Sequence, residues 1–401
     1  MTEVSPKGKG LSSARDVVCF SHLRWDFVYQ RPQHLMSRFA ENGRVFFVEE
    51  PIFDAAEDSV DVSIPSTNVY RLVPRLGSEE GAVNERVRKQ IGRILDRMAV
   101  EEPVAWFYTP MMLDLATDLE PSASVYDCMD ELSGFRGAPP ELLENERRLF
   151  ELADLVFTGG RSLYEAKKNS HRAVYAFPSS VDVSHFAKAR EITEEPDEQR
   201  DIPHPRIGFA GVIDERMDVE LLADIAGLKP DWHFVMIGPV VKISESDLPR
   251  RYNIHYLGIQ PYEKLPEFLA GWDAAMMPFA LNDATKFISP TKTPEYLSAG
   301  LGVVSTAITD VVTPYGDMGL VHIASTAREF VAALDAAMKE NAGTRNSRVA
   351  EFLKENSWDQ TFASMSELID GVIARPQPVT NDADLGGSGQ GLLRDKLFCA
   401  A

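Results

Sequence analysis

The stretch SPTKTPEYLSAGLGVVST, residues 289–306, has residue types and spacing that could bind a phosphorylated ligand. Ser289 or Thr293 is suited to capping a helix, and the proline after each of them favours a first helical turn. A helix N-terminus binds phosphate through free N–H groups, and Lys292 adds a full charge there. Glu295 lies on the same helix face and can accept hydrogen bonds from vicinal hydroxyls, as on a ribose. The alternative is a capped surface helix with a Lys–Glu pair.

A second group of candidate residues consists of three carboxylates close together in the chain, Asp127, Asp130 and Glu131. If their side chains converge, the like charges raise one another's pKa, and one of them can serve as a general base. The alternative is an acidic first turn of a helix, which the helix dipole stabilises. We expect Asp130 to contact the substrate or to take part in catalysis.

The third candidate is SHLRWDFVYQRPQHL, residues 21–35, where polar and aromatic side chains crowd around a predicted strand-to-helix turn. The carboxyl end of a parallel strand is where α/β sheets bind ligands. We therefore expect Trp25, Arg31 and Gln33 to line a surface for an acceptor or for a donor sugar. The alternative is a capped helix with the tryptophan packed beneath it.

Short apolar runs alternate with amphipathic stretches along most of the chain, a pattern typical of βα units around a parallel sheet. Residues 57–76 lack a helical period and predict an irregular or short β insertion. The strands expected in the first half are 16–20, 45–48, 104–108, 124–126 and 155–157, with helices over 32–42, 84–98 and 140–152. The strands expected in the second half are 207–210, 233–237, 253–256, 274–277, 303–305 and 320–323, with helices near 218–228, 262–270, 290–299, 326–341 and 346–353.

The two sets of elements predict an α/β protein with two parallel-sheet domains that face a cleft, where a ligand would bind. Residues 188–205 separate the sets, and because they are charged and end in two prolines we expect an exposed linker. The expected domains are therefore 15–187 and 206–358, followed by a C-terminal helix over 359–375. We expect disordered ends at 1–14 and 376–401, because both are polar.

Composition limits the class of protein. A length of 401 residues predicts two or three domains at roughly 150 residues each. The net charge of −20 argues against a nucleic-acid partner, which needs a basic face. None of the three cysteines forms a C-x-x-C pair, so zinc and redox motifs are not expected. The N-terminus has no apolar signal-peptide core, and no run approaches the ~18 apolar residues of a membrane span. We expect a cytoplasmic protein, with peripheral contact at the inner face of the membrane left open.

The segment 289–306 resembles the nucleotide-sugar segment of retaining GT-B-fold glycosyltransferases of the group 1, family 4-like type that serve bacterial polysaccharide synthesis. In that family a glutamate opens an E-x-x-x-A-G-x-x-V-V unit. The resemblance extends over residues 16 to about 370, with further similar segments in the family's order. These segments are FSHLRWDFVYQRPQHLMSRFA (20–40), VYDCMDELSGF (125–135), FPSSVDVSHF (177–186), IGFAGVIDERMDVELL (207–222), WHFVMIGP (232–239) and NIHYLGIQPYEKLPEFLAGWDAAMMPF (253–279).

The resemblance implies two Rossmann-like domains, an acceptor-side domain over 15–187 and a nucleotide-sugar-binding domain over 206–358. It implies that Glu295 binds the ribose hydroxyls and that Arg216 binds phosphate. Lys292 and the backbone around Thr291 would contact the diphosphate, and Asp130 would face the transferred sugar.

The chain departs from the family pattern at three places, which leaves the donor sugar open. Phe287 stands where the family often has a second glutamate. Val212 and Ile213 follow Gly211 where an arginine is common. The loop after the first strand, residues 21–31, is not glycine-rich.

The implied function is transfer of a hexose from a nucleoside diphosphate sugar to a saccharide or lipid-linked acceptor, with retention of configuration. No metal or cofactor beyond the sugar nucleotide is expected, because Arg216 and Lys292 can offset the charge of the diphosphate and no convincing D-x-D motif is present. A nucleotide-sugar epimerase of the same fold and a non-catalytic binding module remain as alternatives.

Overall fold

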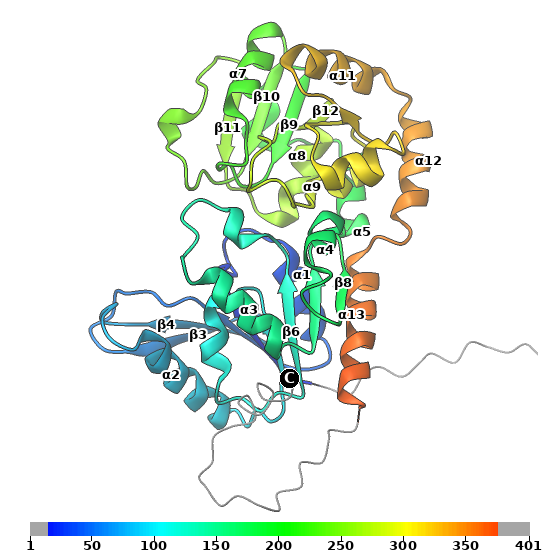
Figure 1. Cartoon of the computed structure of the whole chain (residues 1–401). Helices are drawn as coiled ribbons and strands as arrows, with labels where there is room; N and C mark the ends of the chain where they lie inside the picture. The colour runs from blue at the N-terminus through cyan, green and yellow to red at the C-terminus, as the bar shows by residue number, and fades with distance from the viewer. Residues whose placement is uncertain (1–14, 376–401) are drawn as a thin grey trace, which may run out of the picture.

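The computed structural model describes residues 15–375, which form two α/β domains stacked end to end (Figure 1). The N-terminal domain has an eight-stranded sheet of order β3-β4-β2-β1-β5-β6-β7-β8, in which β3 runs antiparallel to β4 and the other pairings are parallel. Its strands are β1 Val17–Ser21, β2 Val45–Glu49, β3 Ser59–Ser66, β4 Val69–Arg75, β5 Val104–Phe107, β6 Ala123–Cys128, β7 Leu155–Thr158 and β8 Val174–Ala176. Its helices are α1 Arg31–Phe39, α2 Val83–Arg97, α3 Leu142–Leu152 and α4 Arg161–Lys167, with the 3-10 turns η1 Pro110–Ala116 and η2 Leu132–Gly134.

The central strands of this sheet are apolar on both faces because helices cover both faces. In β1, Val18 and Phe20 join a core with residues of α2 and α3, whereas Val17 and Cys19 join a core with residues of α1. The continuous apolar runs in the sequence are therefore strands buried on both sides, as the βα pattern predicted.

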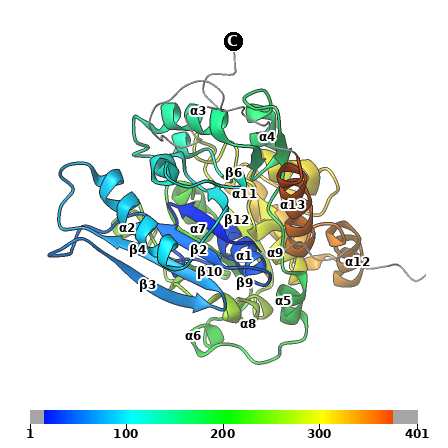
Figure 2. The ribbon, with the colours of Figure 1, turned by 90° about the horizontal axis from the view of Figure 1, so that it is seen from below.

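The segment predicted as an irregular or short β insertion is a regular hairpin. Its strands β3 and β4 pair antiparallel, and β4 also pairs in parallel with β2. The hairpin therefore widens the main sheet at one edge and extends away from the rest of the domain (Figure 2). No residue of β3 is buried, and the exposed residues include neighbours such as Asp61 and Val62, so the strand is open to solvent on both faces.

The C-terminal domain has a six-stranded, fully parallel sheet of order β11-β10-β9-β12-β13-β14. Its strands are β9 Arg206–Ala210, β10 His233–Ile237, β11 Ile254–Gly258, β12 Ala274–Met277, β13 Val303–Ser305 and β14 His322–Ile323. Its helices are α7 Val219–Leu228, α8 Leu265–Ala270, α9 Lys292–Ser298, α10 Thr309–Val311, α11 Ala327–Lys339 and α12 Ala342–Leu353, with shorter turns η4 Glu245–Asp247, η5 Tyr262–Lys264 and η6 Val312–Gly316.

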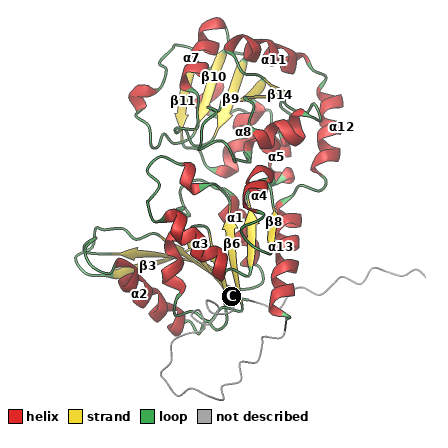
Figure 3. Cartoon of the chain, in the orientation of Figure 1, coloured by secondary structure: helices red, strands yellow, loops and turns green. Residues whose placement is uncertain are grey.

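Helix α13, Trp358–Ile373, returns to the N-terminal domain, so that α12 and α13 run in succession along one side of both domains (Figure 3). Trp358, Met365 and Ile369 of α13 are buried in the same core as β1 and α1. The last helix in the sequence is therefore part of the first domain, a placement that its own amphipathic pattern does not indicate.

The expectation of an exposed linker over 188–205 is wrong for part of the segment. Helix α5 (Val183–Ala187) ends just before it, and the segment itself contains η3 (Lys188–Arg190) and α6 (Asp197–Arg200). Gln199 is fully buried, and its side chain bonds to Trp272 Nε1 and to the Phe268 carbonyl. The segment packs on the C-terminal domain because several of its uncharged side chains, among them Ala189, Gln199 and Ile202, are buried there. The disorder expected for 1–14 and 376–401 falls outside the described residues.

Candidate active site

A pocket between the two domains gathers polar residues from both. Arg31 and Asp130 line it from the N-terminal domain, and Arg216, Thr291 and Lys292 line it from the C-terminal domain. These residues stand at or just beyond the carboxyl ends of strands or at a helix start, where the sequence placed them. Five of the residues proposed from sequence therefore share one pocket.

Arg216 lies on the loop after β9 and is held by Asp214, which is itself buried. Arg216 Nε lies 2.9 Å from Asp214 Oδ1, and Nη2 lies 2.7 Å from Oδ2. Burial by itself would lower the pKa of Arg216, but the hydrogen bonds and charge of Asp214 outweigh it, and the pKa is raised. The guanidinium therefore stays charged, is oriented by a buried carboxylate, and remains partly open to the pocket.

Lys292 is the first residue of α9, and its side chain lies against the loop after β9. A β-carbon at Gly211 would lie 1.9 Å from Lys292 Cε, so the glycine leaves the space that the lysine occupies. Burial lowers the pKa of Lys292, and the nearby Arg216 charge lowers it further, whereas Glu295 opposes the shift. Within residues 15–375 the Lys292 ammonium forms no ion pair or hydrogen bond. A half-buried cation without a partner is suited to an anionic ligand.

Glu295 lies one turn into α9, beside Lys292 but outside the lining of the pocket. Burial raises its pKa to about 7, although the Lys292 charge and a hydrogen bond with Thr291 act in the opposite direction. The carboxyl therefore titrates near neutral pH.

The expected capping of α9 by Ser289 or Thr293 is wrong. The helix begins at Lys292 with Thr291 as the N-cap residue, and no side chain caps it. Ser289 instead forms a contact between domains, because its carbonyl accepts from Ser179 Oγ and its hydroxyl accepts from Ser179 N. The hydroxyl that sequence assigned to a cap thus joins the two domains next to the pocket.

Asp130 follows β6 and reaches the pocket, but the three neighbouring carboxylates do not converge. Asp127 binds Arg31, and Glu131 binds Lys167 at 2.8 Å. Burial raises the pKa of Asp130. The cations around it, Arg216, Arg31 and Lys292, oppose this shift without cancelling it. Asp130 is therefore the single member of the carboxylate group that lines the pocket.

Arg31 and Asp127 form a buried ion pair at the pocket wall. Their exposed fractions are 2% and 0%. Arg31 Nε lies 2.9 Å from Asp127 Oδ2 and Nη2 lies 2.8 Å from Oδ1, while Nη1 donates to the Phe177 carbonyl. The sequence suggested both residues as site candidates, but most donors of Arg31 are used within the protein.

Trp25 and Gln33 do not line the pocket, contrary to the expectation that they face it. Trp25 is 9% exposed and packs edge-on against Phe47 in the core. Gln33 is buried, and its amide donates to the carbonyls of Trp25 and Val28. Both side chains fix the loop between β1 and α1, because its backbone groups need partners away from water.

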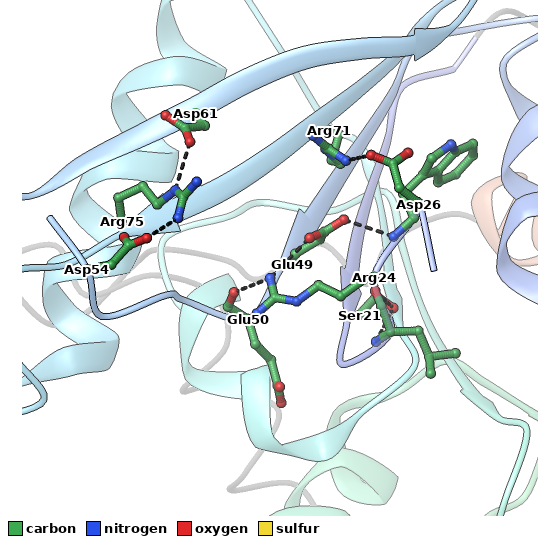
Figure 4. A network of polar contacts seen from close by, with 11 residues as sticks. Ser21, Arg24, Asp26, Glu49, Glu50, Asp54, Asp61, Arg71 and Arg75 are labelled. Atoms are coloured by element: carbon green, nitrogen blue, oxygen red, sulfur yellow. Dashed lines mark hydrogen bonds and ion pairs between the residues drawn. The ribbon is translucent and has the colours of Figure 1, made fainter. Parts of the chain in front are cut away.

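A polar network connects the same loop to the carboxyl end of β2 (Figure 4). Arg24 Nη1 bonds to Glu49 Oε2 at 3.0 Å and to the Glu50 carbonyl at 2.7 Å, and Glu49 Oε1 accepts from Trp25 N. Further pairs connect the loop and the residues after β2 to the hairpin. They are Arg71–Asp26 and Arg75–Asp54, while Arg75 also pairs with Asp61 within the hairpin. The hairpin thus contacts and stabilises the loop that leads to Arg31.

Three residues beside the pocket were not singled out from sequence: Phe135, Glu215 and Lys242. The Phe135 ring contacts Arg216 Cζ at 5.5 Å and Lys242 Nζ at 4.6 Å, so an N-terminal-domain aromatic ring packs on two cations of the other domain. No local pattern marks these residues, because they meet through the pairing of the domains. Within residues 15–375, no group of three or more His, Cys, Asp or Glu side chains is placed to bind a metal ion, and no helix is long and apolar enough to cross a membrane.

Comparison with known sequences finds one curated relative and no matching family model. The relative is the putative teichuronic acid biosynthesis glycosyltransferase TuaH of Bacillus subtilis (strain 168), which is 24% identical over 244 residues. The match covers 55% of this chain and 60% of the relative, so the chain spans somewhat over half the length of the curated protein that it matches.

Solved structures resemble the chain over most of its length. A glycosyltransferase from Rickettsia africae ESF-5 superposes with a TM-score of 0.64 at 11% identity, covering 91% of this chain and 100% of its own. Sucrose-phosphate synthase from Thermosynechococcus elongatus superposes with a TM-score of 0.64 at 14% identity, covering 90% of this chain and 99% of its own. Anabaena Alr3699/HepE in complex with UDP and glucose superposes with a TM-score of 0.61 at 11% identity, covering 89% of this chain and 100% of its own. At these identities the likeness concerns the fold, and the chain has the two-domain fold of the GT-B glycosyltransferases, as its sequence resemblance led us to expect.

Proposed function

We propose that the protein is a glycosyltransferase that binds a nucleoside diphosphate sugar in the pocket between its domains and transfers the hexose to a saccharide or lipid-linked acceptor. The observation that carries this proposal is the half-buried ammonium of Lys292, which has no ion pair or hydrogen bond within residues 15–375 and lines one pocket together with Arg216 and Asp130. A diphosphate is the ligand whose charge matches two cations in an otherwise acidic protein.

In this proposal Lys292, Arg216 and the backbone around Thr291 bind the diphosphate, and Glu295 accepts hydrogen bonds from the ribose. Charge that develops on the leaving diphosphate in the transition state is stabilised by the two fixed cations. Transfer with retention and without a metal ion or further cofactor belongs to the same proposal. Asp130, surrounded by three cations, would face the transferred sugar.

The acceptor and the cellular location follow as further parts of the proposal. The Bacillus subtilis relative is named a putative teichuronic acid biosynthesis glycosyltransferase, and this similarity supports an acceptor in cell-envelope polysaccharide synthesis. We propose that the protein acts in the cytoplasm, and peripheral contact with the inner face of the membrane stays open.

A panel of sugar nucleotides in a thermal-shift assay tests the proposal. A donor that binds the folded protein stabilises it by about 2.7 kcal/mol at a concentration one hundred times its Kd. We expect at least one of UDP-glucose, UDP-galactose, GDP-mannose and ADP-glucose to raise Tm, and Lys292→Met to abolish the rise. No shift with any sugar nucleotide, at concentrations up to 10 mM, would count against the proposed site.

The donor found in this way also separates the alternatives. Release of the nucleotide only when an acceptor is added supports a transferase. A changed sugar without an acceptor supports an epimerase, and binding without turnover over a broad acceptor panel supports a binding module.

A further inference from the structure

Glu215, on the loop after β9, is a buried carboxylate whose hydrogen-bonding capacity is unused. Its side chain is 8% exposed, and neither of its carboxylate oxygens accepts a hydrogen bond from residues 15–375. Lys242 Nζ lies 3.8 Å from Oε1, which is too long for a hydrogen bond. A carboxylate removed from water normally accepts several hydrogen bonds, so the fold carries an unfavourable arrangement here.

A second unused acceptor faces this region from the other domain. His22 comes directly after β1, and its Nδ1 atom is buried without a partner among the described residues. Burial and, to a smaller extent, the Lys242 charge lower the pKa of His22 to about 4, although a hydrogen bond with the Tyr108 backbone opposes the shift. The ring is therefore neutral at physiological pH.

Lys242 relates these two acceptors to the pocket. Its ammonium approaches Glu215, affects the pKa of His22, and lies 4.6 Å from the centre of the Phe135 ring. Arg216 contacts the same ring, and Arg216 lines the pocket. Lys242 and Arg216 therefore share one aromatic ring at the edge of the proposed diphosphate site, and Glu215 lies beside Lys242 although it is outside the lining of the pocket.

The arrangement is not accounted for by stability within the protein. Lys242 is 46% exposed on its side chain, so its ion pair with Glu215 contributes little. Asp214, next in the chain, shows the contrast, because Arg216 satisfies its oxygens. The groups that would satisfy Glu215 and a neutral His22 are uncharged hydrogen-bond donors, and hydroxyl groups on a sugar ring are such donors. An anionic ligand would be repelled by the carboxylate.

We propose that Glu215 binds hydroxyl groups of the sugar attached to the nucleotide, and that it thereby selects the donor sugar. Glu215 directly precedes Arg216, so the part of a ligand that reaches it is the group joined to the diphosphate. Phe135 of the other domain packs on Arg216 and Lys242 next to this position, and His22 offers a further acceptor across the domain boundary. This inference rests on the proposed function and adds a residue that recognises the sugar.

Calorimetric titration of the Glu215→Gln variant with a sugar nucleotide and with its free nucleoside diphosphate tests the inference. The probes are UDP-glucose and UDP, or GDP-mannose and GDP if the panel selects guanine. We expect the affinity for the sugar nucleotide to fall at least about tenfold, because a charged acceptor is lost, and the affinity for the free diphosphate to stay unchanged. Glu220→Gln, an exposed glutamate at the start of α7, should change neither affinity.

The Tm of Glu215→Gln separates ligand binding from a purely structural role, because loss of a structural residue would lower Tm. Removing the charge of a buried carboxylate that accepts no hydrogen bond within residues 15–375, and whose ion pair with Lys242 is weak, should leave Tm unchanged or raise it. If Glu215→Gln gave insufficient folded protein, Glu215→Asp, which retracts the carboxylate, should show the same selective loss.

Equal losses for the sugar nucleotide and the free diphosphate, or no loss for either, would overturn the inference while leaving the glycosyltransferase proposal intact. A wild-type protein that bound neither probe nor any other sugar nucleotide would overturn both.

Discussion

Two cations from opposite walls of the same pocket, the buried Arg31 and the half-buried Lys292, have contrasting surroundings. Arg31 is held by Asp127 and by the Phe177 carbonyl. Burial alone would lower its pKa, but Asp127 outweighs burial and raises it. Lys292 has no ion pair or hydrogen bond within residues 15–375, and burial lowers its pKa. The same location therefore holds one cation that the protein satisfies and one that it does not.

The difference shows that burial and charge alone do not distinguish a structural residue from a ligand-binding one. The distinction depends on whether the protein supplies the partner. Arg216 is intermediate, because Asp214 binds it on one side while its guanidinium still reaches the pocket. The same reasoning separates Asp127 from Asp130 on the N-terminal side.

The largest effect expected from this comparison is on stability. Arg31→Met leaves Asp127 buried without its partner and should lower the free energy of unfolding by about 3–5 kcal/mol. Urea unfolding followed by fluorescence measures the change. The double variant Arg31→Met/Asp127→Leu should recover most of the loss, since an apolar pair of similar volume replaces the ion pair. If Arg31→Met were as stable as the wild type, Arg31 would not be a structural residue, and the contrast with Lys292 would be wrong.

Lys292→Met should show the opposite behaviour. We expect kcat/KM for the donor to fall about 100-fold, because a charged group that meets the leaving diphosphate is lost. The free energy of unfolding should stay the same or rise, since the half-buried ammonium has no partner to lose. Steady-state kinetics and urea unfolding measure the two quantities, and Lys264→Met, at an exposed position of the same domain, is the control. A large loss of stability with normal turnover would assign Lys292 to the structural class.

The smallest effect concerns pH. The pKa of Glu295 is about 7 in the folded protein, against 4.5 for an ordinary glutamate, and the ionised form is the better acceptor for ribose hydroxyls. Donor affinity should therefore rise up to about tenfold between pH 6 and pH 8. Because the folded-state pKa is the higher one, the stability that Glu295 contributes is present below about pH 4.5 and is lost as the pH rises through about 7.

Glu295→Gln should remove both trends and weaken donor binding at pH 8. Titration calorimetry at pH 6, 7 and 8 measures the affinity, and thermal unfolding at the same pH values measures the stability. Identical pH profiles for variant and wild type would exclude Glu295 from both effects.

The fold could be predicted from sequence to the extent that local patterns specify it. Buried strands such as 233–237 and 303–305 appear at the expected positions, because a parallel strand covered on both faces needs a continuous apolar run. The hairpin of β3 and β4, in which β3 has no buried residue, was only partly anticipated. The return of α13 to the first domain depends on which apolar surface remains uncovered after both sheets form, and no segment of sequence carries that information.

The sequence by itself determined which residues come close to the pocket. Arg216 and Asp130 follow strands, Lys292 begins a helix, and the carboxyl ends of parallel strands meet along one edge of each sheet. The tertiary structure decided which charges remain available there. Asp127 and Arg31 are 96 residues apart in the chain, and their pairing follows from packing between a strand and a distant helix. Trp25 and Gln33 were drawn into the interior in the same way. Proximity to a strand end is a local property of the chain, whereas the partner of a side chain is set by the whole fold.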